Sequence, residues 1–537
     1  MSQLPDYVAS AQPNPKENRA PWLTTTAATY AGIMLWFVFW SNLPGAGGGI
    51  GGVLSQGLLF ALVSLVIAAL ICHFGFYYVP AMLGMKTGLP LYIVGTSTYG
   101  ATGGFIMPGF LMGCLQFGWL SVNGFFSGLG LACIIQGATT WEEVNAVSGG
   151  ALHISIGITW AVVAAFVGLK GIKYVGMVAS YMPVFPIIVL LSLLVMTIGG
   201  IGKFDRGKMM TETAETQAAA AESMSTVYSL DVKSLPGIEN EISPVLWNYG
   251  RIEVDVNALP GAERDEYEKI KAQSEIGPPV TLYGSGLLGV LSLICAYVVG
   301  FFATAGAAGC DFGSNNKDEK AVQMGGFVGI AGATIFTGGI ALIAIAFAQG
   351  SGTIPAFAMN PCDSMGTILG NPTIAGLFMF LLAIAAFPGA CFSSLIAANS
   401  FKTTLPKVNP FVSCGIGTLV ACVLIASGLA GKAEGVFGII GASFGPVCGA
   451  MMADYFLAGK KWAGPRAGFN PAGWISWAVG FAVGGLPLVG ILTNVIPCPP
   501  VAAFVVGFGL YYALAKAGME SPKLDMPQRI DNYTDHG

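Results

Sequence analysis

The 537-residue chain is 54% hydrophobic and 10% charged, whereas about a quarter of the residues in a soluble domain are charged. Its mean hydropathy is +0.69, and its apolar runs are long enough to cross a bilayer, so the composition excludes a soluble globular protein. The net charge of -4 gives no indication of a nucleic-acid partner. Nearly all of the 11 cysteines lie inside apolar runs, which indicates small hydrophobic side chains and no disulfide framework.

Apolar runs bounded by turn residues predict an all-α polytopic membrane protein with about twelve transmembrane helices. The expected helices lie near residues 23–43, 53–83, 103–135, 150–169, 174–200, 280–309, 321–349, 372–398, 410–430, 435–457, 470–493 and 498–515.

The basic residues predict the orientation of these helices. If the N-terminus is cytoplasmic, the short outer loops hold only Lys432. This asymmetry follows the positive-inside rule and predicts a multi-pass protein of the cell membrane with both termini cytoplasmic. The expected segments are a tail at 1–22, the first five helices in 23–200, a polar external insert at 201–278, helices six to ten in 279–457, helices eleven and twelve in 458–515, and a tail at 516–537.

Motifs of energy-coupling enzymes and of metal sites do not occur. The chain lacks a Gly-x4-Gly-Lys-Ser/Thr loop, so we expect no ATP hydrolysis. Its three histidines are too few and too scattered for a metal cluster. His73, near the middle of a helix, is either a proton relay or a packing residue. We therefore expect no enzyme, no metal and no organic cofactor.

Glycines interrupt two helices in corresponding places. Gly32 lies mid-span in the first helix, and Gly300, Gly306 and Gly309 lie in the sixth. Because glycine weakens a helix by about 1 kcal/mol relative to alanine, we expect unwinding there. The two helices would begin two five-helix repeats whose broken helices expose backbone groups at mid-membrane. Glycines at every fourth position instead indicate close helix packing: Gly325 and Gly329, and Gly441, Gly445 and Gly449.

The third helix carries a polar and aromatic face. Gln116, Trp119 and Asn123 follow at spacings of three and four, which places two amides and an indole on one side of a helix. Such a face suits a flat ligand with hydrogen-bond donors and acceptors at its edge. The alternative is that these side chains only join helices to one another.

Five segments resemble the nucleobase-cation symporter-1 family, which includes cytosine and purine permeases and allantoin and hydantoin transporters. The resemblance runs from about residue 17 to residue 462 apart from the insert. It implies a leucine-transporter-like fold, with two inverted five-helix repeats followed by two C-terminal helices. The segments are Lys86-Thr-Gly-Leu, Gly95-Thr-Ser-Thr-Tyr-Gly, Gln116-Phe-Gly-Trp119, Gly300-Phe-Phe302 through Asp311-Phe312, and Pro446-Val-Cys-Gly449-Ala-Met-Met-Ala-Asp454-Tyr455.

The resemblance also implies roles for single residues. Trp119 matches the tryptophan that stacks on the substrate ring, and Gln116 matches the glutamine that bonds the ring edge. Phe302 matches the aromatic residue that closes the sandwich from the other face. The expected substrate-binding residues are Gln116, Trp119, Asn123, Gly300, Phe301 and Phe302.

The coupling cation remains open between a proton and sodium. Gly32 and Trp36 match the helix-one stretch whose carbonyls help to bind sodium in sodium-coupled members. Ala385 and Ala386 occupy the helix-eight stretch where those members have hydroxyl side chains. Sodium prefers oxygen ligands, so the loss of hydroxyls weakens that site. Asp311, near the inner end of helix six, is a candidate carboxylate for proton coupling.

These observations predict a symporter that imports a nucleobase or a related heterocycle such as cytosine, purine, allantoin or hydantoin by alternating access. Its partners would be the heterocycle, the cation and the lipid bilayer. One alternative keeps the fold and carries an amino acid or a vitamin precursor, because fold does not determine the ligand. Another is a non-transporting sensor that uses the external insert.

Overall fold

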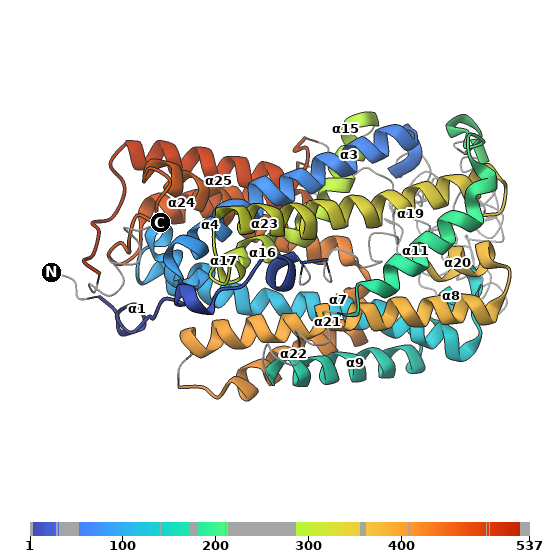
Figure 1. Cartoon of the computed structure of the whole chain (residues 1–537), viewed down its shortest axis with the longest axis horizontal. Coiled ribbons are helices and arrows are strands. Elements are labelled where there is room, and N and C mark those ends of the chain that lie inside the picture. The colour runs from blue at the N-terminus through green and yellow to red at the C-terminus, as the bar shows by residue number, and fades with distance from the viewer. Residues whose placement is uncertain are drawn as a thin grey trace, which may run out of the picture.

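The computed structural model shows the chain as a bundle of long helices, most of which run along the long axis of the view while α11 (Val184–Thr197) crosses obliquely (Figure 1). Most of the first expected helix, including Gly32 and Trp36, and most of the expected insert lie outside the described residues. The described residues are 4–27, 30–31, 53–139, 141–170, 175, 181–209, 211–212, 286–354, 361–405, 407–489, 491–492 and 495–526.

The long helices follow the apolar runs. Several of them include π-helical segments, labelled η, that continue the same helix. In chain order they are α3 (Leu58–Ile71), η5 (Cys72–Tyr77) and α4 (Tyr78–Thr87); η6 (Phe105–Phe110) and α7 (Leu111–Gln136); α9 (Ala151–Leu169); α11 (Val184–Thr197); α15 (Gly286–Cys295), η11 (Ala296–Gly300) and α16 (Phe301–Ala307); α18 (Glu319–Gly326), η12 (Phe327–Gly332) and α19 (Ala333–Gly350); α21 (Pro372–Thr404); α22 (Pro410–Ala426); α23 (Ala433–Leu457); α24 (Pro471–Gly485); and α25 (Pro499–Lys516).

Short helices connect the long ones. They are α1 (Asp6–Ala9), α5 (Leu91–Val94), α6 (Thr96–Tyr99), α8 (Trp141–Val147), α17 (Gly309–Gly313) and α20 (Pro361–Leu369).

Within the described ranges, nine helices are long and apolar enough to cross a membrane, and two shorter apolar helices cover Val184–Gly200 and Pro410–Ala426. Large apolar side chains such as Leu59, Phe166 and Leu419 are more than half exposed on these helices. Exposed apolar surface on so many helices fits lipid and not water. The prediction of an all-α multi-pass membrane protein is therefore confirmed.

Local sequence signals define several helix ends. The Asn371 side chain accepts hydrogen bonds from the backbone N–H groups of Thr373 and Ile374, and the Asp318 carboxylate accepts one from Ala321 at 2.7 Å. These caps satisfy donors that the first helical turn leaves free. Proline follows the cap of α21, where its missing N–H costs nothing.

The helices form two groups (Figure 1). In the first group, α7, α9, α21 and α22 contact one another and lie along the lower side of the view. The second group lies above it and joins α16 to α23, and α23 to α24 and α25. The space between α7 and α21 of the first group and α16 of the second holds the candidate site described below.

The expected unwinding of the sixth helix is not observed at Gly300 or Gly306. The helix continues from Gly286 to Ala307 with a π-helical segment over Ala296–Gly300, and it is interrupted only at Ala308. The glycines instead allow close contact: a Cβ on Gly300 would lie 2.8 Å from the Phe437 carbonyl oxygen, and one on Gly306 would lie 2.7 Å from the Phe76 Cβ. Packing against neighbouring helices explains these glycines.

Close packing also explains the glycine series on α23, as expected. A Cβ on Gly441 would lie 2.8 Å from the Pro500 ring, and one on Gly449 would lie 2.1 Å from the Phe504 carbonyl oxygen. Both neighbours belong to α25. The spacing of four residues therefore forms the contact between α23 and α25.

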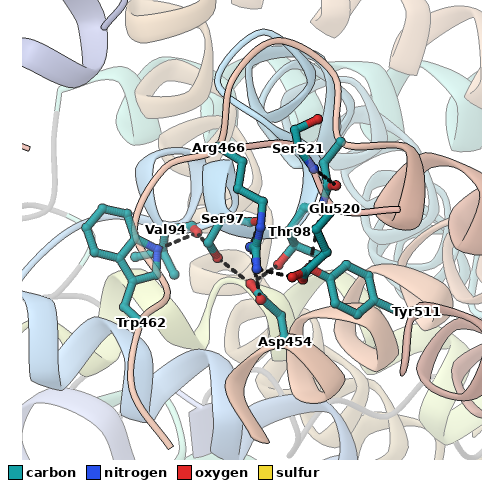
Figure 2. Close-up of polar contacts among 10 residues, drawn as sticks. Val94, Ser97, Thr98, Asp454, Trp462, Arg466, Tyr511, Glu520 and Ser521 are labelled. Carbon is teal, nitrogen blue, oxygen red and sulfur yellow. Dashed lines mark hydrogen bonds and ion pairs between the residues drawn. The ribbon is translucent and has the colours of Figure 1, made fainter. Parts of the chain in front are cut away.

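A buried ion cluster, here called the Arg466 cluster, joins three distant parts of the chain (Figure 2). The Arg466 guanidinium donates to Asp454 Oδ1 at 3.0 Å and to Glu520 Oε1 at 2.6 Å, and the Arg466 and Asp454 side chains are each only 4% exposed. Ser97 Oγ and Thr98 Oγ1 donate to the other Asp454 oxygen at 2.6 and 3.2 Å. The cluster thus ties α6 to the end of α23 and to the segment after α25.

The N-terminal segment reaches the same end of the molecule. The Tyr7 hydroxyl donates to the Ala101 carbonyl, and the Ala101 N–H donates to the Arg466 carbonyl. The Asn14 amide donates to Asn315 Oδ1 at 3.1 Å. Both described end segments therefore lie at one end of the helices, as an even number of crossings requires. The side of the membrane stays a prediction.

Candidate functional site

A small cavity lies where α7 and α21 face α16. Its volume is about 30 Å³, which is room for about two water molecules. Polar side chains from three helices reach it. Its lining residues are Gln116, Trp119, Asn123, Thr304, Ala305, Ala386, Gly389, Phe392, Ser393 and Ile396.

The structure brings together the three residues that helical spacing placed on one face. Gln116, Trp119 and Asn123 are all buried on α7, and all line the cavity. A helical face of two amides and an indole therefore points at the interface between the two helix groups. Their role in binding a substrate stays a prediction.

Trp119 connects the two helix groups. Its indole N–H donates to the Thr304 hydroxyl on α16 at 3.1 Å. Its ring lies against Phe301, with ring centroids 3.9 Å apart, and near Phe437, at 5.8 Å. Aromatic pairs of this kind contribute about 0.5–1.5 kcal/mol beyond their buried area.

Asn123 bonds protein groups through both ends of its amide. Its amide nitrogen donates to the Ala386 carbonyl at 2.9 Å, and its amide oxygen accepts from the Trp160 indole N–H at 3.1 Å. These bonds join α7 to α21 and α9 within the first helix group. Asn123 therefore holds the wall of the cavity in place. Joining helices in this way is the alternative role predicted from the sequence for this polar face.

Gln116 has a weaker partner. Its amide nitrogen donates to the Met112 sulfur at 3.3 Å, one turn earlier on α7. A thioether is a poor acceptor compared with an oxygen. The Gln116 amide can exchange this partner for a better acceptor on a ligand at little cost.

The aromatic residues of the sixth helix are arranged differently from the expectation. Phe301, and not Phe302, lies against Trp119. Phe302 is fully buried and packs on Tyr30 at a centroid distance of 5.8 Å. Successive residues of a helix point about 100° apart, so only one of the two can face α7. Gly300 lines no part of the cavity and instead contacts Phe437.

The expected ion-binding residues are only partly described. Gly32 and Trp36 lie outside the described residues. Ala386 lines the cavity, but its carbonyl already accepts from Asn123, and Ala385 is buried away from the cavity lining. In the described part of the chain, no group of three or more His, Cys, Asp and Glu residues could hold a metal ion.

Two hydroxyl groups at the cavity were not expected from the sequence. Thr304 lies one turn after Gly300 in a segment whose glycines drew attention first. Ser393 lines the cavity from α21, and its hydroxyl donates to the Gly389 carbonyl at 3.3 Å. The sequence placed Ser393 about two turns from Ala386 and so too far from the site. Ser393 follows the cavity-lining residues Ala386 and Gly389 at helical spacing, and that spacing was the available signal.

A second, larger cavity lies beside the first, toward the end where the described termini lie. Its volume is about 210 Å³. It shares Phe392 and Ile396 with the small cavity. Its other lining residues are Leu91, Tyr92, Pro108, Gly109, Met112, Ala308, Asp311, Phe312, Asn315, Leu395, Asn399 and Ser400.

Residues 276–503 match the model of a protein family described as permease for cytosine/purines, uracil, thiamine, allantoin. No curated protein matches the chain in sequence. The fold is similar to that of Mhp1, described as a nucleobase-cation-symport-1 family transporter in a closed conformation with bromovinylhydantoin bound. The TM-score is 0.59 at 13% identity, and the match covers 98% of this chain and 99% of that chain.

Two further structures show the same fold. The inward-facing conformation of Mhp1 matches with a TM-score of 0.54 at 14% identity, covering 98% of this chain and 97% of that chain. A substrate-bound outward-open Na⁺-coupled sialic acid symporter matches at 0.50 and 14% identity, covering 97% and 93%. These matches confirm the expected leucine-transporter-like fold. The family match over residues 276–503 agrees with the resemblance drawn from the motifs.

Proposed function

Because the chain is a membrane transporter related to the permeases for cytosine/purines, uracil, thiamine and allantoin, and not an enzyme, we propose that it is a secondary active symporter for a flat nitrogen heterocycle. Cytosine, a purine, allantoin and hydantoin are the candidate substrates. A proton or sodium gradient drives uptake, and the two helix groups move against each other to give alternating access.

One observation carries this proposal: the Gln116 and Trp119 side chains line a cavity between the two helix groups. An indole face offers stacking to any flat ring, and a buried amide distinguishes rings by their edge atoms. An unpaired buried polar group costs about 1–3 kcal/mol, so the amide rejects rings that cannot pair with it. Neither the amino acid carrier nor the sensor is favoured by this cavity or by the family match.

The size of the cavity links binding to motion. Trp119 and Phe301 lie 3.9 Å apart. A ring stacked between them needs about 3.5 Å on each side, or about 7 Å in all. Binding between these rings therefore needs roughly 3 Å more space, which a movement of α16 away from α7 would supply while breaking the bond between Trp119 and Thr304. Since α7 and α16 belong to different helix groups, substrate binding changes the position of one group relative to the other.

Two cations fit the described residues differently. The stretch from Ile384 to Pro388 carries no hydroxyl side chain, and the Ala386 carbonyl is already bonded to Asn123. Sodium would have fewer oxygen ligands here than a site with hydroxyls provides. This difference supports a proton, while the Na⁺-coupled sialic acid symporter of the same fold supports sodium.

Uptake into proteoliposomes tests the proposal. Radiolabelled cytosine, uracil, adenine, hypoxanthine, allantoin and hydantoin are offered under an imposed proton gradient or an imposed sodium gradient. We expect one of these compounds to accumulate, and only under one gradient. Accumulation with protons alone identifies the proton as the coupling cation, and sodium dependence identifies sodium. If none of the six accumulates under either gradient, the proposed substrate class is wrong.

A further inference from the structure

The larger cavity and the small one share two lining side chains. Phe392 and Ile396 line both cavities and lie one turn apart on α21. Met112 lines the larger cavity, and its sulfur accepts the hydrogen bond from Gln116 in the small one. A ligand in the small cavity can therefore enter the larger cavity if Phe392 and Ile396 change rotamer.

The larger cavity has the size and the walls that a small heterocycle requires. A cavity of about 150 Å³ is sufficient for a benzene ring, and this one has about 210 Å³. Its lining includes aromatic side chains, with Phe312 and Phe392 in an edge-to-face pair at 6.3 Å. Its lining also includes the polar side chains of Asp311, Asn399 and Ser400. This combination of aromatic and polar side chains matches a flat ring with polar edge atoms.

Asp311 is the group in this lining with unused bonding capacity. Its carboxylate accepts backbone hydrogen bonds from the N–H groups of Leu91 and of Asp311 itself, and none of the ion pairs within the described part of the chain includes it. An ionised carboxylate offers about four acceptor positions. The positions that the backbone does not fill are costly to leave unpaired in a partly buried place. The N–H groups on the edge of a heterocycle are donors that can fill them.

We propose that the larger cavity is a second binding position for the transported heterocycle, in which the Asp311 carboxylate accepts a ring N–H. This inference rests on the proposed function and adds a step to it. The ring leaves the stack against Trp119, passes Phe392 and Ile396, and pairs with Asp311 before it reaches the end of the molecule where the described termini lie. With the predicted orientation, this position is on the cytoplasmic, release side.

Equilibrium binding of a radiolabelled base to the purified full-length chain tests this proposal. The probe is cytosine or, where the uptake experiment identifies another base, that base. We expect two molecules bound per chain. Trp119→Ala removes the first position and Asp311→Asn weakens the second by at least about tenfold, so each variant binds one molecule. Glu319→Gln, an exposed carboxylate on α18 that lines neither cavity, serves as the control and binds two.

Ser400→Leu provides a second test that does not depend on the charge. Ser400 lines the larger cavity only, and a leucine at this position fills part of its volume. We expect this variant also to bind one molecule per chain, with the affinity of the remaining position unchanged within about twofold. Size-exclusion chromatography of each variant confirms that the chain is folded.

Three outcomes overturn the proposal in distinguishable ways. One molecule per chain, removed entirely by Trp119→Ala, shows a single central position and leaves the proposed function intact. If Asp311→Asn still binds two molecules and loses only proton-driven accumulation, Asp311 carries the coupling proton and does not bind the ring. No binding of any base that the uptake experiment offers rejects the proposed function itself, and the second position with it.

Discussion

The central cavity and the Arg466 cluster are both polar groups buried among apolar helices, but they differ in how completely their groups are paired. Each charged group of the cluster has an oppositely charged partner, and Asp454 accepts from two hydroxyls as well. In the central cavity, the Gln116 amide nitrogen bonds only a sulfur. Complete pairing fixes a structure, because any movement leaves a charge unpaired. Incomplete pairing leaves capacity for a ligand.

The two regions also differ in what they join. The Arg466 cluster connects α6, the end of α23 and the segment after α25, and Figure 2 shows the side chains that meet there. The central cavity lies between the two helix groups, where a bond from Trp119 to Thr304 and a ring contact between Trp119 and Phe301 join them. A neutral bond of this kind contributes about 1 kcal/mol. Separating the groups of the Arg466 cluster therefore costs more free energy than separating the two helix groups at the cavity.

The largest effect we expect is loss of stability in Asp454→Asn. The substitution keeps the shape of the side chain and leaves Arg466 with one acidic partner, Glu520, which is partly exposed. Breaking a buried ion pair from one side costs about 3–5 kcal/mol. We expect a lower thermal midpoint of the purified protein and less folded protein in the membrane, while uptake per folded molecule stays close to that of the unaltered chain.

The double variant Asp454→Asn with Arg466→Met provides the control for this prediction. It removes the unpaired charge, so it should recover part of the lost stability. Unchanged thermal stability in the single variant would show that the cluster does not stabilise the fold. Loss of uptake per folded molecule would instead place the cluster in the transport cycle.

The second effect is loss of transport in Trp119→Ala. Stacking of a base on an aromatic ring contributes about 1–3 kcal/mol, and the alanine also removes the contact with Phe301. We expect uptake to fall by about 100-fold while the amount of folded protein persists, measured as initial rates in proteoliposomes. Trp119→Phe keeps a ring but loses the N–H that Thr304 accepts, so it should retain part of the uptake. Normal uptake by Trp119→Ala would reject the site assignment.

The third effect is a change of selectivity in Gln116→Ala. The variant loses an edge hydrogen bond but no stacking surface, so a base with polar edge atoms should lose more affinity than a plain aromatic compound. We expect a loss of about tenfold for the base and less than twofold for an aromatic inhibitor without edge donors. Competition of both compounds against labelled substrate measures the difference. Equal losses of affinity for the two compounds would mean that Gln116 supports the fold and does not bond the ring edge.

The sequence predicted the long helices well, because an apolar run of about twenty residues has few other structures in a bilayer. It also placed Gln116, Trp119 and Asn123 on one face, since their spacing needs only helical geometry. It did not distinguish their roles. Asn123 is held by Ala386 and Trp160, and those contacts depend on how distant helices pack.

The sixth helix differs from the prediction in its glycines and in the ring beside Trp119, and both differences have one physical cause; the role of Phe302 in binding stays a prediction. Glycine in a membrane helix can mark either unwinding or close packing, and the sequence of the sixth helix does not say which neighbour approaches Gly300. The choice between Phe301 and Phe302 depends on the rotation of the same helix, which the π-helical segment over Ala296–Gly300 changes. A single extra residue in such a turn alters which side chains face α7. Such a shift is set by tertiary packing and has no signature in the local sequence.

The different positions of Phe301 and Phe302 lead to the prediction with the smallest expected effect, and it is the most specific test of the site. Phe301→Leu removes the ring that lies 3.9 Å from Trp119, whereas Phe302→Leu removes a ring that packs on Tyr30. Both substitutions replace a fully buried phenylalanine with the same residue, so their costs in stability should be similar. An aromatic pair contributes about 0.5–1.5 kcal/mol, which corresponds to a loss in substrate affinity of roughly two- to tenfold for Phe301→Leu only. A larger loss in Phe302→Leu, measured by competition binding, would mean that the sixth helix turns during transport and presents Phe302 to the ring.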